Sequence, residues 1–265
     1  MIDLPQSKLE LRSNDFQDSF GFGLPPVLLP YAPASVGDWV IRRRLGGISN
    51  SYVARSAVDP DFHVLQHQDT TWMSTALFEL ESHAFHLQCA GGLVVTAGLG
   101  MGMFAAAAAA KPEVDRVIVV EIDDQIIDLV GRRLIPQRPD LSKKIRIIQG
   151  NALDYEFMRT IADQAGRPDL LLNDVYPTVP HEDAPGDTAQ MVEALDPVTA
   201  GWWGQELEIA LFAQVNEIPL DLRCLELFSQ EYRVPFTPSD GYVTFCQDVA
   251  DAHDIDLTAV TGFRP

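Results

Sequence analysis

The sequence predicts an α/β protein with a Rossmann-like parallel sheet and helices on both faces. Two observations carry this prediction. An apolar run over 93–96 is followed by a glycine-rich turn, a helix-forming segment and a second apolar run over 117–120. Two more apolar runs, over 145–148 and 169–173, each follow a helix-length segment. Strands that alternate with helices in this way pair in parallel, and the helices cover the sheet.

Three regions are predicted along the chain. Residues 1–38 are rich in proline and glycine and are expected to form an irregular arm. Residues 39–73 carry short candidate strands separated by turns, which predicts a small antiparallel β region ahead of the sheet. Residues 74–265 are assigned to the Rossmann-like domain, which begins with an amphipathic helix over 74–89.

The turn after the first strand has the composition of a nucleotide-binding loop. Glycine stands at Gly98, Gly100 and Gly102, and six consecutive alanines over 105–110 follow. Alanine is a strong helix former, and glycine lets a ligand approach the backbone next to the helix N-terminus. Glu121 ends the second apolar run, where an acid can accept hydrogen bonds from the two hydroxyls of a ribose.

The pattern G-x-G-x-G, with an acid about 20 residues further on, resembles the class I S-adenosylmethionine (SAM) methyltransferases. The run AGLGMGM followed by VVEID is most similar to the spermidine-synthase-like branch of that superfamily. The resemblance covers residues 64–177 and implies that the chain binds SAM. The cofactor-binding residues it implies are Gly98, Leu99, Gly100, Gly102, Glu121, Ile122, Asn151, Ala152 and Asp174.

The resemblance also implies roles for single residues. Ile122 is expected to cover one face of the adenine ring, and Asn151 to accept a hydrogen bond from the adenine amino group, where the family usually has aspartate. Asp174 and Tyr176 are expected to be catalytic. In spermidine synthases the matching acid deprotonates the attacking amine. In methyltransferases the same position often contacts the SAM amino group or the nucleophile.

Two departures from the spermidine synthase pattern favour methyl transfer. Those enzymes hold the amine of decarboxylated SAM with an aspartate in the glycine turn, where this chain has Leu99 and Met101. An apolar turn with free N–H groups would tolerate the carboxylate of intact SAM. The residues that follow Asp174 include no second acid to hold a diamine. We therefore expect a SAM-dependent methyltransferase that acts on a small-molecule acceptor.

Two alternatives stay open at this point. The first is an aminopropyltransferase that uses decarboxylated SAM, and the acidic composition keeps it open because it favours a cationic acceptor. The second is a SAM-cleaving enzyme or a non-catalytic protein with the same fold.

The C-terminal third is expected to depart from a complete Rossmann-like sheet. Residues 178–200 are polar and carry three prolines, which predicts a lid. A helix is expected from Trp202 to about residue 216. After it, 242–246 reads as a strand and 224–228 as a weaker one. The sheet is therefore expected to be truncated, or to be completed by another subunit.

Composition limits the partners and the compartment. The formal net charge of −19 argues against nucleic acids and anionic membranes as partners. The three cysteines lack metal or redox spacing, and the first 20 residues do not resemble a signal peptide, so we expect a cytoplasmic protein. The acidic segment 181–187 is expected to be solvated, and no metal site is expected. A homodimer is left open.

Overall fold

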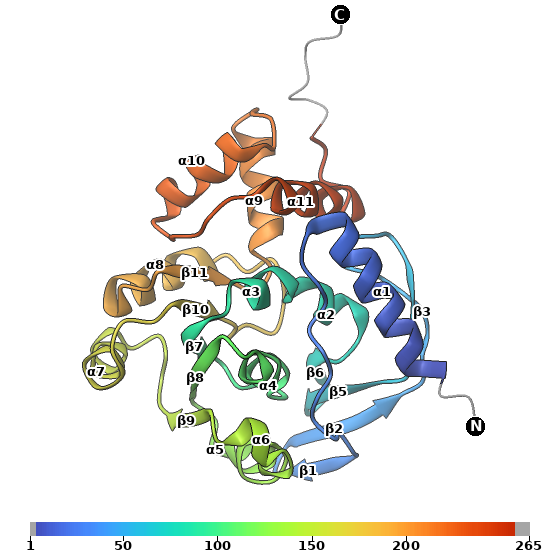
Figure 1. Cartoon of the computed structure of the whole chain (residues 1–265), viewed down its shortest axis with the longest axis vertical. Helices are drawn as coiled ribbons and strands as arrows, with labels where there is room; N and C mark the ends of the chain where they lie inside the picture. The colour runs from blue at the N-terminus through green and yellow to red at the C-terminus, as the bar shows by residue number, and fades with distance from the viewer. Residues whose placement is uncertain (1–3, 258–265) are drawn as a thin grey trace, which may run out of the picture.

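The centre of the computed structural model is a five-stranded parallel sheet with the strand order β11-β10-β7-β8-β9 (Figure 1). The structure describes the backbone of residues 4–257 and the side chains of residues 12–257. The predicted α/β class and its parallel sheet are confirmed. The strands are β7 (Gly92–Ala97), β8 (Val114–Glu121), β9 (Ile145–Gln149), β10 (Leu170–Asn173) and β11 (Thr199–Trp202).

Helices connect these strands in the expected order. Helix α4 follows the glycine turn and packs against β8, and its alanines from Ala105 to Ala109 are buried, because small side chains let a helix approach a sheet closely. The helical segments between β7 and β10 are α4 (Met103–Ala110), α5 (Asp124–Ile126), the π-helical turn η1 (Ile127–Arg132), η2 (Ile135–Gln137), α6 (Pro139–Ser142) and α7 (Tyr155–Ala165).

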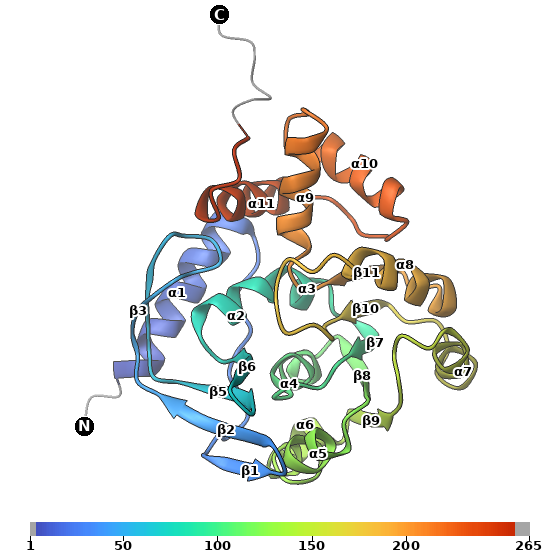
Figure 2. The same ribbon diagram turned by 180° about the vertical axis from the view of Figure 1, so that it is seen from behind.

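A small antiparallel sheet precedes the parallel one, as expected. Its strand order is β1-β2-β5-β6, and a separate two-stranded ribbon is formed by β3 and β4. It lies beside the parallel sheet in both ribbon views (Figures 1 and 2). The strands are β1 (Ala34–Val36), β2 (Trp39–Arg44), β3 (Gly47–Ser49), β4 (Ala57–Asp59), β5 (Phe62–His67) and β6 (Thr70–Ser74).

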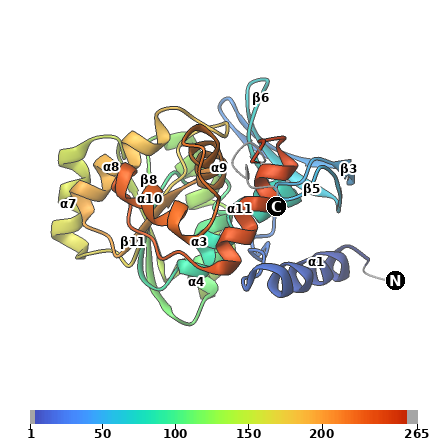
Figure 3. The ribbon, with the colours of Figure 1, turned by 90° about the horizontal axis from the view of Figure 1, so that it is seen from above.

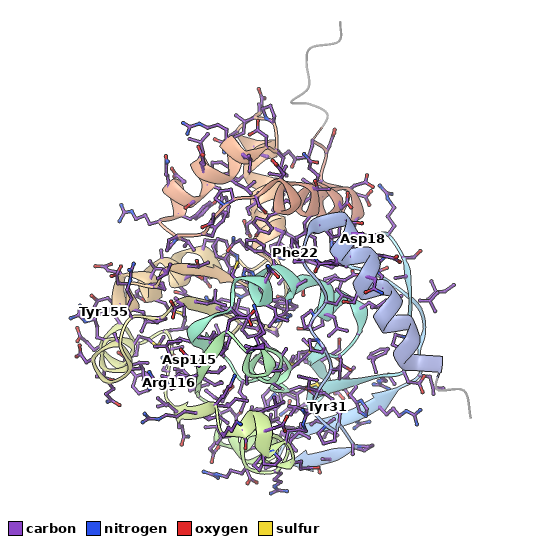
Figure 4. All side chains as sticks on the ribbon, in the orientation of Figure 1. Asp18, Phe22, Tyr31, Asp115, Arg116 and Tyr155 are labelled. Carbon is purple, nitrogen blue, oxygen red and sulfur yellow. The ribbon has the colours of Figure 1, made fainter. Side chains whose placement is uncertain are left out.

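The N-terminal segment is not the irregular arm that the sequence predicts. Helix α1 (Leu4–Phe20) occupies much of it, and residues 1–3 lie outside the described part. Phe16 and Phe20 stand at helical spacing and pack on Phe245 of helix α11 (Asp240–Ala252). Figure 3 shows α1 along the side of the molecule, and Figure 4 labels Phe22, whose ring also packs on Phe245. Most of the prolines lie beyond residue 20, so the composition of the whole segment concealed the helix.

The helix expected over 74–89 is divided into α2 (Leu77–Ser82) and α3 (Ala84–Cys89). His83 stands at the break, with φ −97° and ψ −6°. Its side chain is completely buried. The break therefore directs a histidine into the interior, and the site described below depends on it.

The C-terminal third corrects three expectations. The segment predicted as a lid contains helix α8 and strand β11, and both segments predicted as strands, 224–228 and 242–246, are helical. Their buried side chains repeat at helical spacing, which tertiary packing favours over the local strand propensity. Within residues 4–257 no strand joins the sheet after β11, so the sheet is truncated as expected. The helices are α8 (Ala184–Leu195), α9 (Gln205–Val215), α10 (Leu222–Tyr232) and α11 (Asp240–Ala252).

None of the helices within residues 4–257 has both the length and the apolar composition needed to cross a bilayer.

Candidate functional site

A cavity of about 370 Å³ lies where the carboxyl ends of the parallel strands meet the antiparallel sheet. This volume is in the range of small-molecule sites. The segments after β7, β8, β9 and β10 form one side of the cavity, and side chains of β2, β5 and β6 form the other. Open parallel sheets bind ligands at this edge, so this cavity is the candidate functional site.

Most of the predicted site residues line this cavity, and two do not. Leu99 is 5% exposed and packs in the core below the turn. Gly102 begins α4 with a φ of 71°, and a side chain there would meet the core residues beneath it. The predicted residues that line the cavity are Gly98, Gly100, Glu121, Ile122, Asn151, Ala152, Asp174 and Tyr176.

Glu121 is held rigidly at the end of β8. Its Oε2 accepts a hydrogen bond of 2.8 Å from the Leu99 N–H, and its Oε1 accepts one of 2.8 Å from the Asp123 N–H. Burial raises the pKa of this carboxyl group, and these backbone hydrogen bonds oppose the rise. Each carboxylate oxygen can accept more than one hydrogen bond, so Glu121 keeps acceptor capacity for ribose hydroxyls.

The neighbouring wall offers apolar surface to a flat ring. Ile122 is 64% exposed and Leu153 is 40% exposed, and both line the cavity. Asn151 also lines it, and its Oδ1 accepts a hydrogen bond of 3.0 Å from the Leu153 N–H. This bond fixes the amide next to the two apolar side chains, where the predicted adenine contact would lie.

The glycine turn offers fewer free N–H groups than its composition predicts. Four of its N–H groups already donate to protein acceptors, at distances between 2.7 and 2.8 Å. A ligand carboxylate would therefore find few donors at this turn. Two of these bonds go to backbone carbonyls: Gly98 N–H donates to Val120, and Gly102 N–H donates to Leu99. The other two go to side chains: Leu99 N–H donates to the Glu121 carboxylate, and Met101 N–H donates to Met73 Sδ.

Asp174 has a buried histidine as its partner, which the sequence did not indicate. The Asp174 side chain is 20% exposed and lines the cavity, whereas His83 is completely buried. His83 Nε2 lies 3.2 Å from Asp174 Oδ2. Burial alone would lower the pKa of His83, but the hydrogen bond and charge of Asp174, together with Glu79, raise it to about 9. In the sequence, His83 is one residue of the segment 74–89 that is predicted as an amphipathic helix.

Three acidic residues line the cavity, and no lysine or arginine does within the described residues. The three are Glu121, Asp123 and Asp174. A positively charged ligand would therefore be stabilised by the cavity, and a carboxylate would be repelled.

An aromatic wall from the antiparallel sheet completes the site. The rings of Trp39 and Trp72 meet edge to face with centroids 5.4 Å apart, and the rings of Trp39 and His67 are 4.7 Å apart. Trp39 Nε1 donates a hydrogen bond of 2.8 Å to Asp123 Oδ2. Aromatic faces attract cations, so this wall agrees with the acidic character of the cavity.

Tyr176 lines the cavity and is held by the acidic segment. Its hydroxyl group donates a hydrogen bond to Asp187, and its ring stacks on His181 with centroids 3.9 Å apart. The predicted catalytic tyrosine thus has its hydroxyl engaged by the protein. Within residues 12–257 no group of three acidic, histidine or cysteine side chains is arranged to bind a metal ion.

Loss of the Glu121 carboxylate should weaken nucleoside binding. We expect Glu121→Ala to lower the affinity for 5′-methylthioadenosine by about 1–3 kcal/mol, because the acceptor for the ribose hydroxyls is lost. Asp124→Ala removes the same charge three residues later, at an exposed position outside the cavity, and should keep the affinity. Isothermal titration calorimetry measures both. Equal affinities in the two variants would rule out the ribose assignment.

Comparison with solved structures finds spermidine synthases. The spermidine synthase from Thermotoga maritima matches with a TM-score of 0.38 and 15% identity, over 66% of this chain and 55% of that chain. A spermidine synthase in complex with the transition state analogue AdoDATO matches with a TM-score of 0.35 and 15% identity, over 63% of this chain and 52% of that one. The matched region thus spans about half the length of these enzymes. No family model and no curated protein matches the sequence.

These comparisons correct the expected activity. We expected a methyltransferase first and an aminopropyltransferase second, but both of these solved structures are spermidine synthases. The methyltransferase expectation is therefore wrong, and its alternative takes first place. A likeness of this extent concerns the fold, so the activity has to be derived from the chemistry of the cavity.

Proposed function

We propose that this protein is an aminopropyltransferase, which moves the aminopropyl group of decarboxylated SAM to an amine acceptor. The observation that carries the proposal is the charge of the cavity. Three carboxylates line it, and no lysine or arginine does within the described residues. Decarboxylated SAM has a sulfonium and an ammonium group and no carboxylate, so every charge on it is complementary to this cavity.

The glycine turn supports the same choice of donor substrate. Intact SAM has a carboxylate, which needs hydrogen-bond donors or a cation when it leaves water. The N–H groups of Leu99 and Met101 are already bonded to the protein. The turn therefore has few donors left to compensate a buried carboxylate, whereas the amine of the decarboxylated form needs acceptors.

Different residues of the cavity would contact the ribose, the adenine ring and the charged groups of decarboxylated SAM. Glu121 would hold the ribose, and the apolar side chains of Ile122 and Leu153 would contact the adenine ring. Asp174 would lie beside the reacting atoms, and the wall formed by Trp39 and Trp72 would stabilise the positive charges by cation–π contact.

The transfer follows from this arrangement. An acceptor ammonium has no lone pair, so it first loses a proton to the Asp174 carboxylate. Its nitrogen then attacks the aminopropyl carbon that is bonded to the sulfonium sulfur. The C–N bond forms as the C–S bond breaks, and the electron pair of that bond returns to sulfur. The products are 5′-methylthioadenosine and a secondary ammonium.

Ligand preference tests the proposed donor. Isothermal titration calorimetry should show that decarboxylated SAM binds at least about tenfold more tightly than SAM, a difference of about 1.4 kcal/mol. 5′-Methylthioadenosine, which has neither the amine nor the carboxylate, reports on the nucleoside part alone. Equal or tighter binding of SAM would overturn the proposed donor.

A product assay tests the reaction itself. With decarboxylated SAM and an aliphatic diamine, mass spectrometry should detect 5′-methylthioadenosine together with the diamine enlarged by one aminopropyl group. With SAM and the same diamine, neither product is expected. Formation of 5′-methylthioadenosine without the enlarged amine would indicate cleavage instead of transfer, and would contradict the proposal.

A further inference from the structure

The break between α2 and α3 gives His83 an unusual hydrogen bond. His83 Nδ1 lies 2.8 Å from the backbone carbonyl oxygen of Glu79, four residues earlier. In an unbroken helix that carbonyl would accept from the backbone N–H of residue 83. At the break the backbone N–H of His83 donates to the Glu81 carbonyl, and the imidazole takes the vacated acceptor.

This bond determines the protonation of the ring. A carbonyl oxygen only accepts, so Nδ1 must carry a proton. Nε2 is then the nitrogen that faces Asp174 Oδ2 at 3.2 Å. A carboxylate and an unprotonated Nε2 would repel each other at that distance, so one proton lies between them. With a proton on Nε2, His83 is an imidazolium and Asp174 a carboxylate.

The groups around His83 allow it to carry this charge. Glu79 Oε1 of α2 lies 4.0 Å from Nδ1, and Glu206 of α9 also acts on the ring electrostatically. Phe104 of α4 and Trp203 present aromatic rings, and Trp203 stacks on the imidazole with centroids 6.3 Å apart.

His86 of α3 is a neighbouring histidine without an acidic partner. Burial and the charge of His83 together lower its pKa to about 3. Its Nε2 is bonded to the Trp202 carbonyl. It therefore adds no positive charge beside His83.

We propose that His83 is a positioning residue, which holds Asp174 by Oδ2 as an oriented carboxylate and leaves Oδ1 to receive the proton of the acceptor amine. The proposal rests on the proposed function, because it concerns the base of that reaction. No other hydrogen bond to the Asp174 carboxylate is present within residues 12–257, so His83 is its anchor there. Glu79 Oε1 lies on the side of the other ring nitrogen, 4.0 Å from Nδ1.

The surroundings of His83 differ before and after the proton transfer. Before it, the positive His83 is paired with the negative Asp174. When Asp174 takes the proton from the acceptor, the Glu79 carboxyl group remains 4.0 Å from the imidazole. Burial raises the pKa of Glu79 to about 8, and the charge of His83 opposes this rise.

Nitrogen-15 NMR of the imidazole rings tests the anchor without an activity assay. In the full-length protein we expect His83 to stay doubly protonated at pH 7, and Asp174→Asn to lower its pKa by about 1–3 pH units, since the opposite charge is removed. His86 is the internal control, because it is equally buried but bonded to a backbone carbonyl. It should stay neutral in both proteins. A neutral His83 at pH 7 in the unmodified protein would overturn the proposal.

Kinetics of two His83 variants test its effect on Asp174. We expect His83→Leu to lower kcat by about 10²-fold, because the base loses its orientation, while the KM for decarboxylated SAM changes by less than about threefold. His83→Gln can still donate a hydrogen bond to Oδ2 and should recover most of the lost kcat. Equal losses in both variants would indicate a packing role and contradict the proposal.

The two measurements separate this proposal from the proposed function. If no aminopropyl transfer is detected but His83 shows the expected titration, the proposed function fails and the ion pair with Asp174 stands. If transfer is detected but His83 is neutral, or His83→Leu keeps full kcat, the positioning role fails and the proposed function stands.

Discussion

Asp174→Asn is expected to lower the turnover of aminopropyl transfer by about 10²–10⁴-fold, with a much smaller change in the affinity for decarboxylated SAM. The asparagine amide cannot take a proton from the acceptor amine at neutral pH. It has the size of the aspartate and can still form a hydrogen bond with His83 Nε2. The effect should therefore fall on the chemical step.

Single-turnover rates and calorimetric titration separate the two effects. Asp115→Asn is a matched control, since Asp115 is an exposed aspartate near the start of β8, at the other end of the strand from Glu121 (Figure 4). It should keep both turnover and binding. If Asp174→Asn loses binding as strongly as turnover, Asp174 is a substrate-binding residue. If it keeps both, it is not the base.

Gly98→Ala is expected to reduce both stability and activity. Gly98 has a φ of +93°, which side chains rarely adopt, and an added Cβ would overlap the carbonyl oxygen of Asp174. That oxygen belongs to the backbone beside β10 and cannot rotate away. Strain and overpacking together should lower the free energy of unfolding by about 2–5 kcal/mol. The folded fraction should also lose turnover, because the clash displaces Asp174.

Gly100→Ala is the matched control for this variant. Gly100 also has a positive φ, of +48°, but a Cβ there would meet the thioether of Met73, which can change rotamer. We expect a loss of about 1 kcal/mol. Urea unfolding followed by tryptophan fluorescence measures both variants. A loss for Gly98→Ala that is no larger than for Gly100→Ala would show that the backbone contact with Asp174 is not the cause.

The parallel sheet could be predicted because it depends on local patterns. β8 is buried over most of its length, so its sequence is a continuous apolar run. Gly98 and Gly100 both have positive φ values, which glycine adopts without a steric cost. Such features are encoded within a few neighbouring residues.

The helices at both ends of the chain could not be predicted in this way. α1 and α11 meet through Phe16, Phe20 and Phe245, so each helix depends on the other for burial. Residues 242–246 have the composition of a strand and still form part of α11. Burial of aromatic side chains against a distant segment outweighs local propensity, which differs by less than about 1 kcal/mol between most residues.

The sheet, the glycine turn and the places of Glu121 and Asp174 at the ends of strands follow from local sequence patterns. Their surroundings depend on contacts between distant segments. His83 is 91 residues from Asp174, and Trp39 is 84 residues from Asp123. The N–H groups of Leu99 and Met101 are engaged by Glu121 and Met73, which removed the expected preference for a carboxylate. The charge of a cavity and the hydrogen bonds of a buried acid arise from such long-range contacts, which no local pattern encodes.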